Sequence, residues 1–347
     1  MNNDVPSPEH VRPTAAPATH DLGGAPEAAS GPARHPLLTF TVLTLVLSWL
    51  PVIPYALGLF PAPLLASGPF LAAIVTVAVV GGRKGLRAYF RRLIRWRVGV
   101  GWYVVAFLAP VAAWAIAAYV NVLLGAAPPT PAQLAGWSLI VTATLGFLIN
   151  PFGGAWEEPG WRGYALPLLL RRHSALVASA VLGVMWALWH VPLFLTGLIP
   201  WPDAAQVFAL SFVFTAIYLR TAGSVLIAFL LHASINGAGE FFLGLFAAGD
   251  RVRMYWIMAA LCAVVVIAAI VVSRDRWRRV PAVRDNDDAA IGPPLVAEAT
   301  GIESDRTSAA LVVRRHRSRR SPKMRDLRFA ISVLAVPAGA PVPSAAR

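Results

Sequence analysis

Long apolar stretches dominate this sequence and restrict the folds that it can adopt. Eight of them approach the length of about 20 residues that a helix needs to cross a bilayer core of roughly 30 Å. They cover residues 37–60, 63–80, 102–124, 136–153, 174–198, 204–219, 223–246 and 254–273. The sequence therefore predicts an all-α fold, a polytopic membrane helical bundle of about eight transmembrane helices.

The charge content supports this interpretation and excludes a soluble enzyme with a charged surface. Charged residues make up 14% of the chain and hydrophobic residues 57%, whereas an ordinary globular protein has about 25% charged residues. The net charge of +13, taken alone, would indicate a nucleic-acid partner, but for so apolar a chain we expect none. The single cysteine, Cys262, excludes a disulfide framework and a Cys-rich metal cluster.

Composition divides the chain into three parts. Residues 1–35 and 281–347 are rich in Pro and Ala and predict a disordered cytoplasmic arm and a disordered basic tail, on either side of a membrane domain at 36–280. Lys and Arg of this domain gather in loops that lie on one side if eight helices alternate. The positive-inside rule places that side, and both termini, in the cytoplasm. The Ala-, Arg- and Pro-rich composition favours a bacterial plasma membrane.

The most basic loop of the domain, residues 83–97, has a helical pattern of its own. One helical face carries the basic residues and another the apolar residues, namely Lys84, Arg87, Arg91 and Arg95 against Leu86, Phe90 and Leu93. This pattern predicts a helix that rests in the headgroup plane, and a solvated loop that only sets topology is the alternative. In both cases we expect support for the fold and no part in chemistry.

Polar residues at membrane depth are the main functional signal. Only five acidic residues occur in residues 36–273, and a charge near the bilayer centre costs about 2.5–3.5 kcal/mol, so such groups mark functional sites by default. Three clusters stand out: Glu157, Glu158 and Arg162 after the fourth stretch, His190 in the fifth, and His232 with Asn236 in the seventh. Glu240 lies on the helical face of His232 and Asn236 and is a further candidate.

Helical geometry gives the first cluster a specific arrangement. Glu158 and Arg162 are spaced i, i+4 and can pair on one face, whereas Glu157 points about 100° away from Glu158. Pro159, with three glycines nearby, predicts that the helix kinks or begins afresh here. Because irregular backbone at membrane depth is tolerated only inside protein or beside water, we expect a wet cavity.

Together the three clusters suit a hydrolytic reaction. A buried carboxylate can act as a general base, and a neutral imidazole can orient the same water. Donors on another helix can hold an oxyanion, a task worth about 2.7–4 kcal/mol per donor. The structural alternatives are a pair of acids at a helix N-terminus, a histidine bonded to a neighbouring carbonyl, and polar contacts between helices.

The three motifs jointly resemble those of the CPBP family of intramembrane proteases, also called the Abi family. It includes the type II CAAX prenyl endopeptidases and bacteriocin-processing or self-immunity proteins. The motifs are Glu-Glu-x-x-x-Arg at 157–162, aromatic-x-x-x-His at 186–190 and His-x-x-x-Asn at 232–236, and the resemblance covers about 80–250. It implies a metal-independent glutamic endopeptidase that needs no cofactor and cleaves a membrane-associated protein or peptide in the lipid bilayer.

The resemblance also implies a role for each motif residue. Glu157 matches the glutamate that activates the hydrolytic water, and His190 matches the histidine that helps to position it. His232 and Asn236 match the pair assigned to the oxyanion hole. Trp186 replaces the phenylalanine that the family often has, which bears on substrate shape. The remaining motif positions, which shape the pocket, are Glu158 and Arg162.

Two alternatives stay open. His190, His232 and a glutamate would form a known set of zinc ligands, which gives a zinc-dependent variant of the protease. The other alternative is a non-catalytic membrane protein, such as a bacteriocin self-immunity factor, a scaffold or a transporter, in which the polar cluster binds a ligand or partner. The sequence contains no His-Glu-x-x-His motif, so the zinc type of CAAX protease is not supported.

Overall fold

A computed structural model describes residues 35–280, and within that range every regular element is a helix. The predicted all-α fold class is therefore confirmed. The predicted disordered arm (1–35) and basic tail (281–347) lie outside the described residues, except for residue 35 itself. Seven segments are long and apolar enough to cross a membrane, which makes this a multi-pass membrane protein: Pro36–Ala56, Gly68–Leu93, Val100–Leu123, Pro131–Leu170, Pro202–Arg220, Val225–Gly244 and Ala248–Val272.

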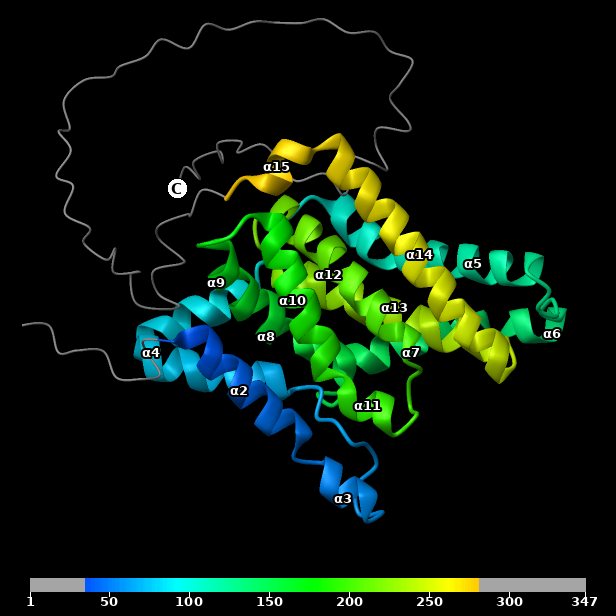
Figure 1. The fold of residues 1–347 in the computed structure, drawn as a ribbon, viewed down its shortest axis with the longest axis horizontal. Coiled ribbons are helices and arrows are strands. Elements are labelled where there is room, and N and C mark those ends of the chain that lie inside the picture. The colour runs from blue at the N-terminus through cyan, green and yellow to red at the C-terminus, as the bar shows by residue number, and fades with distance from the viewer. Residues whose placement is uncertain (1–34, 281–347) are drawn as a thin grey trace, which may run out of the picture.

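The elements follow one another as Figure 1 shows. The first part of the chain forms α2 (Pro36–Trp49), α3 (Val52–Ala56), α4 (Gly68–Leu93), α5 (Val100–Leu123), α6 (Pro131–Leu134) and α7 (Ser138–Ile149). The second part forms α8 (Glu158–Gly160), α9 (Leu166–Leu170), α10 (Ala175–Trp189), α11 (Val191–Leu195), α12 (Pro202–Arg220), α13 (Val225–Gly244), α14 (Ala248–Val272) and α15 (Arg274–Arg278).

The fifth predicted stretch, 174–198, is not one continuous helix. It is divided at His190 into α10, which is shorter than the other crossings, and α11. Pro192 explains the break, because a proline lacks the N–H that would bond the carbonyl of Leu188 and its ring clashes with that carbonyl. The break places the imidazole of His190 at a helix junction.

The second crossing also differs from the prediction, because α4 continues from Gly68 to Leu93 and contains a sharp bend. At Gly82 the backbone has φ 54° and ψ −153°, a conformation that glycine adopts without the steric cost of a Cβ atom. Figure 1 shows the two arms of α4 turned toward each other. Both arms contact the segment that follows α7, since a Cβ on Gly160 would lie 2.4 Å from the backbone of Pro69 and one on Gly163 would lie 3.0 Å from Leu93.

The segment after α7 begins afresh, as the glycines and Pro159 predicted. The helix ends at Ile149, and Gly153 is extended with φ −78° and ψ 149°. The chain then winds through a 3-10 turn (Gly154–Glu157), α8, a π-helical turn (Trp161–Ala165) and α9. Changes of helix type of this sort are frequent at functional sites, and here they set the direction of the two glutamates.

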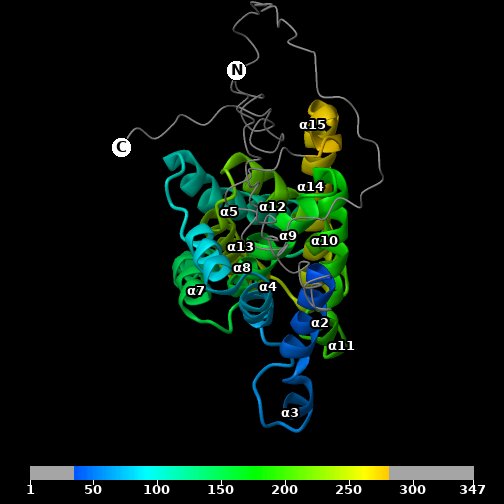
Figure 2. The same cartoon turned by 90° about the vertical axis from the view of Figure 1, so that its left-hand side faces the viewer.

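Helix α13 lies in the interior of the bundle. It packs against α7, α5 and α12, and Figure 2 shows it with α8 between α7 and α10. Close approach to α7 depends on Gly237, because a Cβ there would meet Oγ1 of Thr144 at 2.2 Å. Small residues at such contacts let membrane helices approach closely, and this contact fixes the face of α13 that carries His232.

Candidate active site

The structure brings the three predicted clusters together inside the bundle. The segment after α7 supplies Glu157, Glu158 and Arg162, the junction of α10 and α11 supplies His190, and α13 supplies His232 and Asn236. The two glutamates, Arg162 and the two histidines are buried, with at most 8% exposure, and Asn236 is half-buried. Charged and polar groups that share one buried place are costly unless they pair or perform chemistry.

Glu158 links the first cluster to α13. Its Oε1 accepts hydrogen bonds from Nη1 of Arg162 and from Nδ1 of His232, both at 2.8 Å. The predicted i, i+4 ion pair is therefore present. The contact with His232 joins residues 74 positions apart, so the pair also ties two helices together.

Arg162 is held between aromatic rings. Its guanidinium carbon lies 4.2 Å from the ring centroid of Trp186 and 4.1 Å from that of Phe214. Such cation–π contacts gain strength when water is excluded. Its Nε and Nη2 atoms have no hydrogen-bond partner in the part of the chain that the structure describes. Arg162 thus serves as a fixed positive charge beside Glu158.

Trp186 connects the other two catalytic candidates. Its indole Nε1 donates a hydrogen bond of 2.5 Å to Oε2 of Glu157. Its backbone carbonyl accepts a hydrogen bond of 2.8 Å from Nδ1 of His190, one turn later. Because a carbonyl oxygen only accepts, the Nδ1 atom of His190 carries the proton, and in the neutral ring Nε2 is a free acceptor.

Gly154 marks the space that three of the site residues share. A Cβ atom on this glycine would lie 2.7 Å from Nδ2 of Asn236, 3.3 Å from Oε1 of Glu157 and 3.4 Å from Nε2 of His232. These three atoms come from two elements, and the missing side chain leaves them facing one small volume. The oxygen of Glu157 that points there is the one that Trp186 does not bind.

Sequence reasoning missed two contacts of the bent helix α4. Tyr89 donates a hydrogen bond of 3.0 Å to the carbonyl of Pro159, and Nη1 of Arg92 donates one of 3.5 Å to the carbonyl of Gly163. Both side chains are buried, so part of the 83–97 segment packs against the segment that carries the two glutamates. The sequence signal for these contacts was the i, i+3 spacing of Tyr89 and Arg92, which places both on one face of the predicted helix.

Two further acidic residues of the membrane domain differ in burial: Asp203 is buried and was not predicted, whereas the predicted candidate Glu240 is exposed. Asp203 lies in the first turn of α12 and is 8% exposed. The sequence signal for this buried acid was the polar start of the 204–219 stretch. Glu240, a candidate from the face of His232 and Asn236, is exposed and lies outside the cluster.

The two histidines of the site have separate partners, and the zinc-dependent variant stays an untested alternative. Among residues 35–280, no group of three or more His, Cys, Asp or Glu side chains is arranged to hold a metal ion. Instead, the histidines are tied separately, with His190 on the carbonyl of Trp186 and His232 on Glu158.

The fold and this cluster define a multi-pass membrane protein with a buried site of acids, histidines and an amide. Residues 136–238, which contain all six predicted site residues, match the family described as type II CAAX prenyl endopeptidase Rce1-like. The resemblance to the CPBP family is thereby confirmed. "CAAX prenyl protease 2" of Methanococcus maripaludis is 54% identical over 37 residues, which cover 11% of this chain and only 14% of that protein.

Proposed function

We propose that this chain is an intramembrane endopeptidase in which Glu157 activates the water that attacks the peptide bond. The observation that carries the proposal is the convergence of Glu157 Oε1, His232 Nε2 and Asn236 Nδ2 on the space beside Gly154. One base and two potential donors around a single small volume are what peptide hydrolysis requires. The Rce1-like match supports a protease of the CAAX type.

Glu157 is suited to be the base because its two oxygens have different surroundings. Trp186 holds Oε2 in place, which leaves Oε1 to take a proton from a water beside Gly154. The Nε2 atom of His190 is an acceptor and orients the same water in this proposal. The water oxygen bonds to the carbonyl carbon of the substrate while its proton passes to Glu157.

The oxyanion that forms requires donors. Asn236 presents an amide N–H from Nδ2, and His232 presents Nε2. Since Nδ1 of His232 donates to Glu158, Nε2 also donates only when the ring is an imidazolium. The Glu158 carboxylate that accepts this hydrogen bond also pairs with Arg162, which holds it in place beside the ring. Collapse of the intermediate breaks the C–N bond, and the proton on Glu157 passes to the leaving amine.

The substrate in this proposal is a membrane-associated protein or peptide, and the cellular location is a plasma membrane with both termini in the cytoplasm. The buried site supports a substrate that reaches it within the bilayer. The name of the Methanococcus maripaludis relative refers to prenylated substrates, but the residues around Gly154 define only the peptide-bond chemistry.

The experiment compares membrane-associated peptides in cells that carry the wild-type chain, Glu157→Gln or His190→Ala. We expect a cleaved species in wild-type cells that both variants abolish while their expression and thermal unfolding stay normal. Glu240→Gln is the matched control, because Glu240 is exposed and its change should leave cleavage intact. If the cellular phenotype persists in both site variants, the chain acts as a non-catalytic binding protein.

A further inference from the structure

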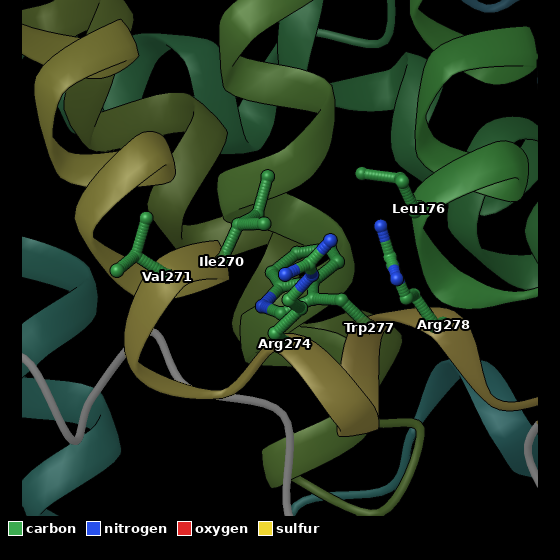
Figure 3. Close-up of a pocket in the computed structure, with 6 residues that line it drawn as sticks. All are labelled: Leu176, Ile270, Val271, Arg274, Trp277 and Arg278. Carbon is green, nitrogen blue, oxygen red and sulfur yellow. The ribbon is translucent and has the colours of Figure 1, made fainter.

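A second candidate site lies at the far end of α10 from His190. A cavity of about 310 Å³ opens between the start of α10, the end of α14 and α15 (Figure 3). Its lining residues are Leu176, Ile270, Val271, Arg274, Trp277 and Arg278. None of them belongs to the polar cluster around Glu157, so any ligand here is separate from the substrate of the proposed reaction.

The lining combines an apolar wall with two positive charges. Leu176, Ile270 and Val271 come from the ends of two membrane helices, whereas Arg274 and Arg278 are exposed on α15. Figure 3 shows the guanidinium of Arg278 directed toward Leu176. Neither arginine forms an ion pair with any residue of the described range.

Two further groups make the cavity favourable for an anion. The indole N–H of Trp277 is buried, at 1% exposure of the residue, and has no hydrogen-bond partner among residues 35–280. A buried donor without a partner destabilises the fold, and a ligand acceptor that bonds to it removes this cost. In addition, Ser174 caps α10 beside Leu176, so the positive end of a 15-residue helix dipole faces this region.

We propose that this cavity binds an anionic phospholipid. Its phosphate contacts Arg274, Arg278 and the indole N–H of Trp277, and its acyl chains lie along Leu176, Ile270 and Val271. Charge complementarity identifies the headgroup as anionic. The apolar wall identifies a lipid and not a free phosphate, because it continues α14, whose 25 residues form one of the most apolar crossings. Basic pockets between membrane helices bind anionic headgroups in this way.

The expected consequence of lipid binding is that the position of α10 is restrained. This helix carries Trp186 near its other end and leads into His190, so a lipid bound between its first turn and α15 restrains the element that positions two site residues. Binding itself does not depend on the proposed function, and it is measured without any substrate.

The experiment measures retention of phosphatidylglycerol by the purified full-length chain in neutral detergent, using native mass spectrometry over a series of lipid concentrations. The test variant is Arg274→Gln with Arg278→Gln. The matched control is Arg83→Gln with Arg87→Gln, which removes two exposed charges from α4. Phosphatidylcholine and inorganic phosphate are the other two ligands.

We expect the test variant to weaken phosphatidylglycerol binding about thirtyfold, since each basic residue near a membrane surface contributes about fivefold. The control should change it less than threefold, and phosphatidylcholine should bind weakly. Equal losses in both variants, unchanged binding in the test variant, or equal occupancy by inorganic phosphate would each overturn the proposal. A fourth outcome would also overturn it, namely phosphatidylglycerol binding that appears only when Asp285, Asp287 and Asp288 are changed to Asn. That result would mean that the acidic residues after α15, and not a lipid, occupy the cavity in the wild-type chain.

Discussion

The contact between Trp186 and Glu157 allows a single donor to be removed with little other change. In Trp186→Phe an aromatic ring remains over Arg162 and against Phe214, whose ring centroid lies 5.6 Å from that of Trp186. The backbone carbonyl that holds His190 is also kept. The main change is the loss of the indole N–H, which lies 2.5 Å from Oε2 of Glu157.

The magnitude follows from the type of hydrogen bond. A bond to a charged group contributes about 1.5–3 kcal/mol, and each 1.36 kcal/mol of lost transition-state stabilisation is a tenfold loss of rate. If the bond holds Glu157 in its reactive orientation, Trp186→Phe should lower the cleavage rate about 10- to 150-fold. The substrate concentration at half-maximal rate should change little, because Trp186 acts on the base.

Trp189→Phe provides the matched control. Trp189 lies on the same helix and is equally buried, at 1% exposure against 2% for Trp186, but its Nε1 has no hydrogen-bond partner within the described residues. The assay measures glutamate-dependent cleavage in proteoliposomes, with thermal unfolding of each variant recorded alongside. Equal losses of rate in the two variants, or no loss in Trp186→Phe, would refute a specific role for the donor.

Three further predictions concern packing, charge and topology. Gly154→Ala should reduce cleavage by about tenfold or more, with little change in thermal unfolding, because its Cβ would lie 2.7 Å from Nδ2 of Asn236. Glu158→Gln should lower the free energy of unfolding by about 3–5 kcal/mol in denaturation experiments, since it leaves the buried Arg162 without its counter-charge. In a Cys262→Ser background, cysteines placed at Arg87 and Ala127, which are both exposed, should react with an impermeant maleimide from opposite sides of the membrane.

Each of these predictions has a control or a contrary outcome. Gly146→Ala, whose Cβ would meet nothing within 4 Å, should retain cleavage. For Glu158, a loss of stability no larger than that of the exposed Glu240→Gln variant would show that the buried pair does not stabilise the fold. Labelling of both cysteines from the same side would contradict the alternating topology that the basic loops predict.

Local patterns in the sequence determined the features that depend on neighbouring residues. The apolar stretches placed most membrane helices, because crossing a bilayer requires a certain length of apolar helix. The i, i+4 spacing predicted the pair of Glu158 and Arg162, and the glycines with Pro159 predicted the restart of the helix after α7. Each of these depends on the geometry of a single helix.

Only the tertiary structure decided which groups from different helices touch. The indole of Trp186 reaches Glu157 across 29 residues, the imidazole of His232 reaches Glu158 across 74, and the phenol of Tyr89 reaches the carbonyl of Pro159 across 70. These contacts depend on how far each helix is rotated and how closely its neighbour approaches, through glycines such as Gly154 and Gly237. One sequence records which side chains are present, but the packing of helices selects the partners that they meet.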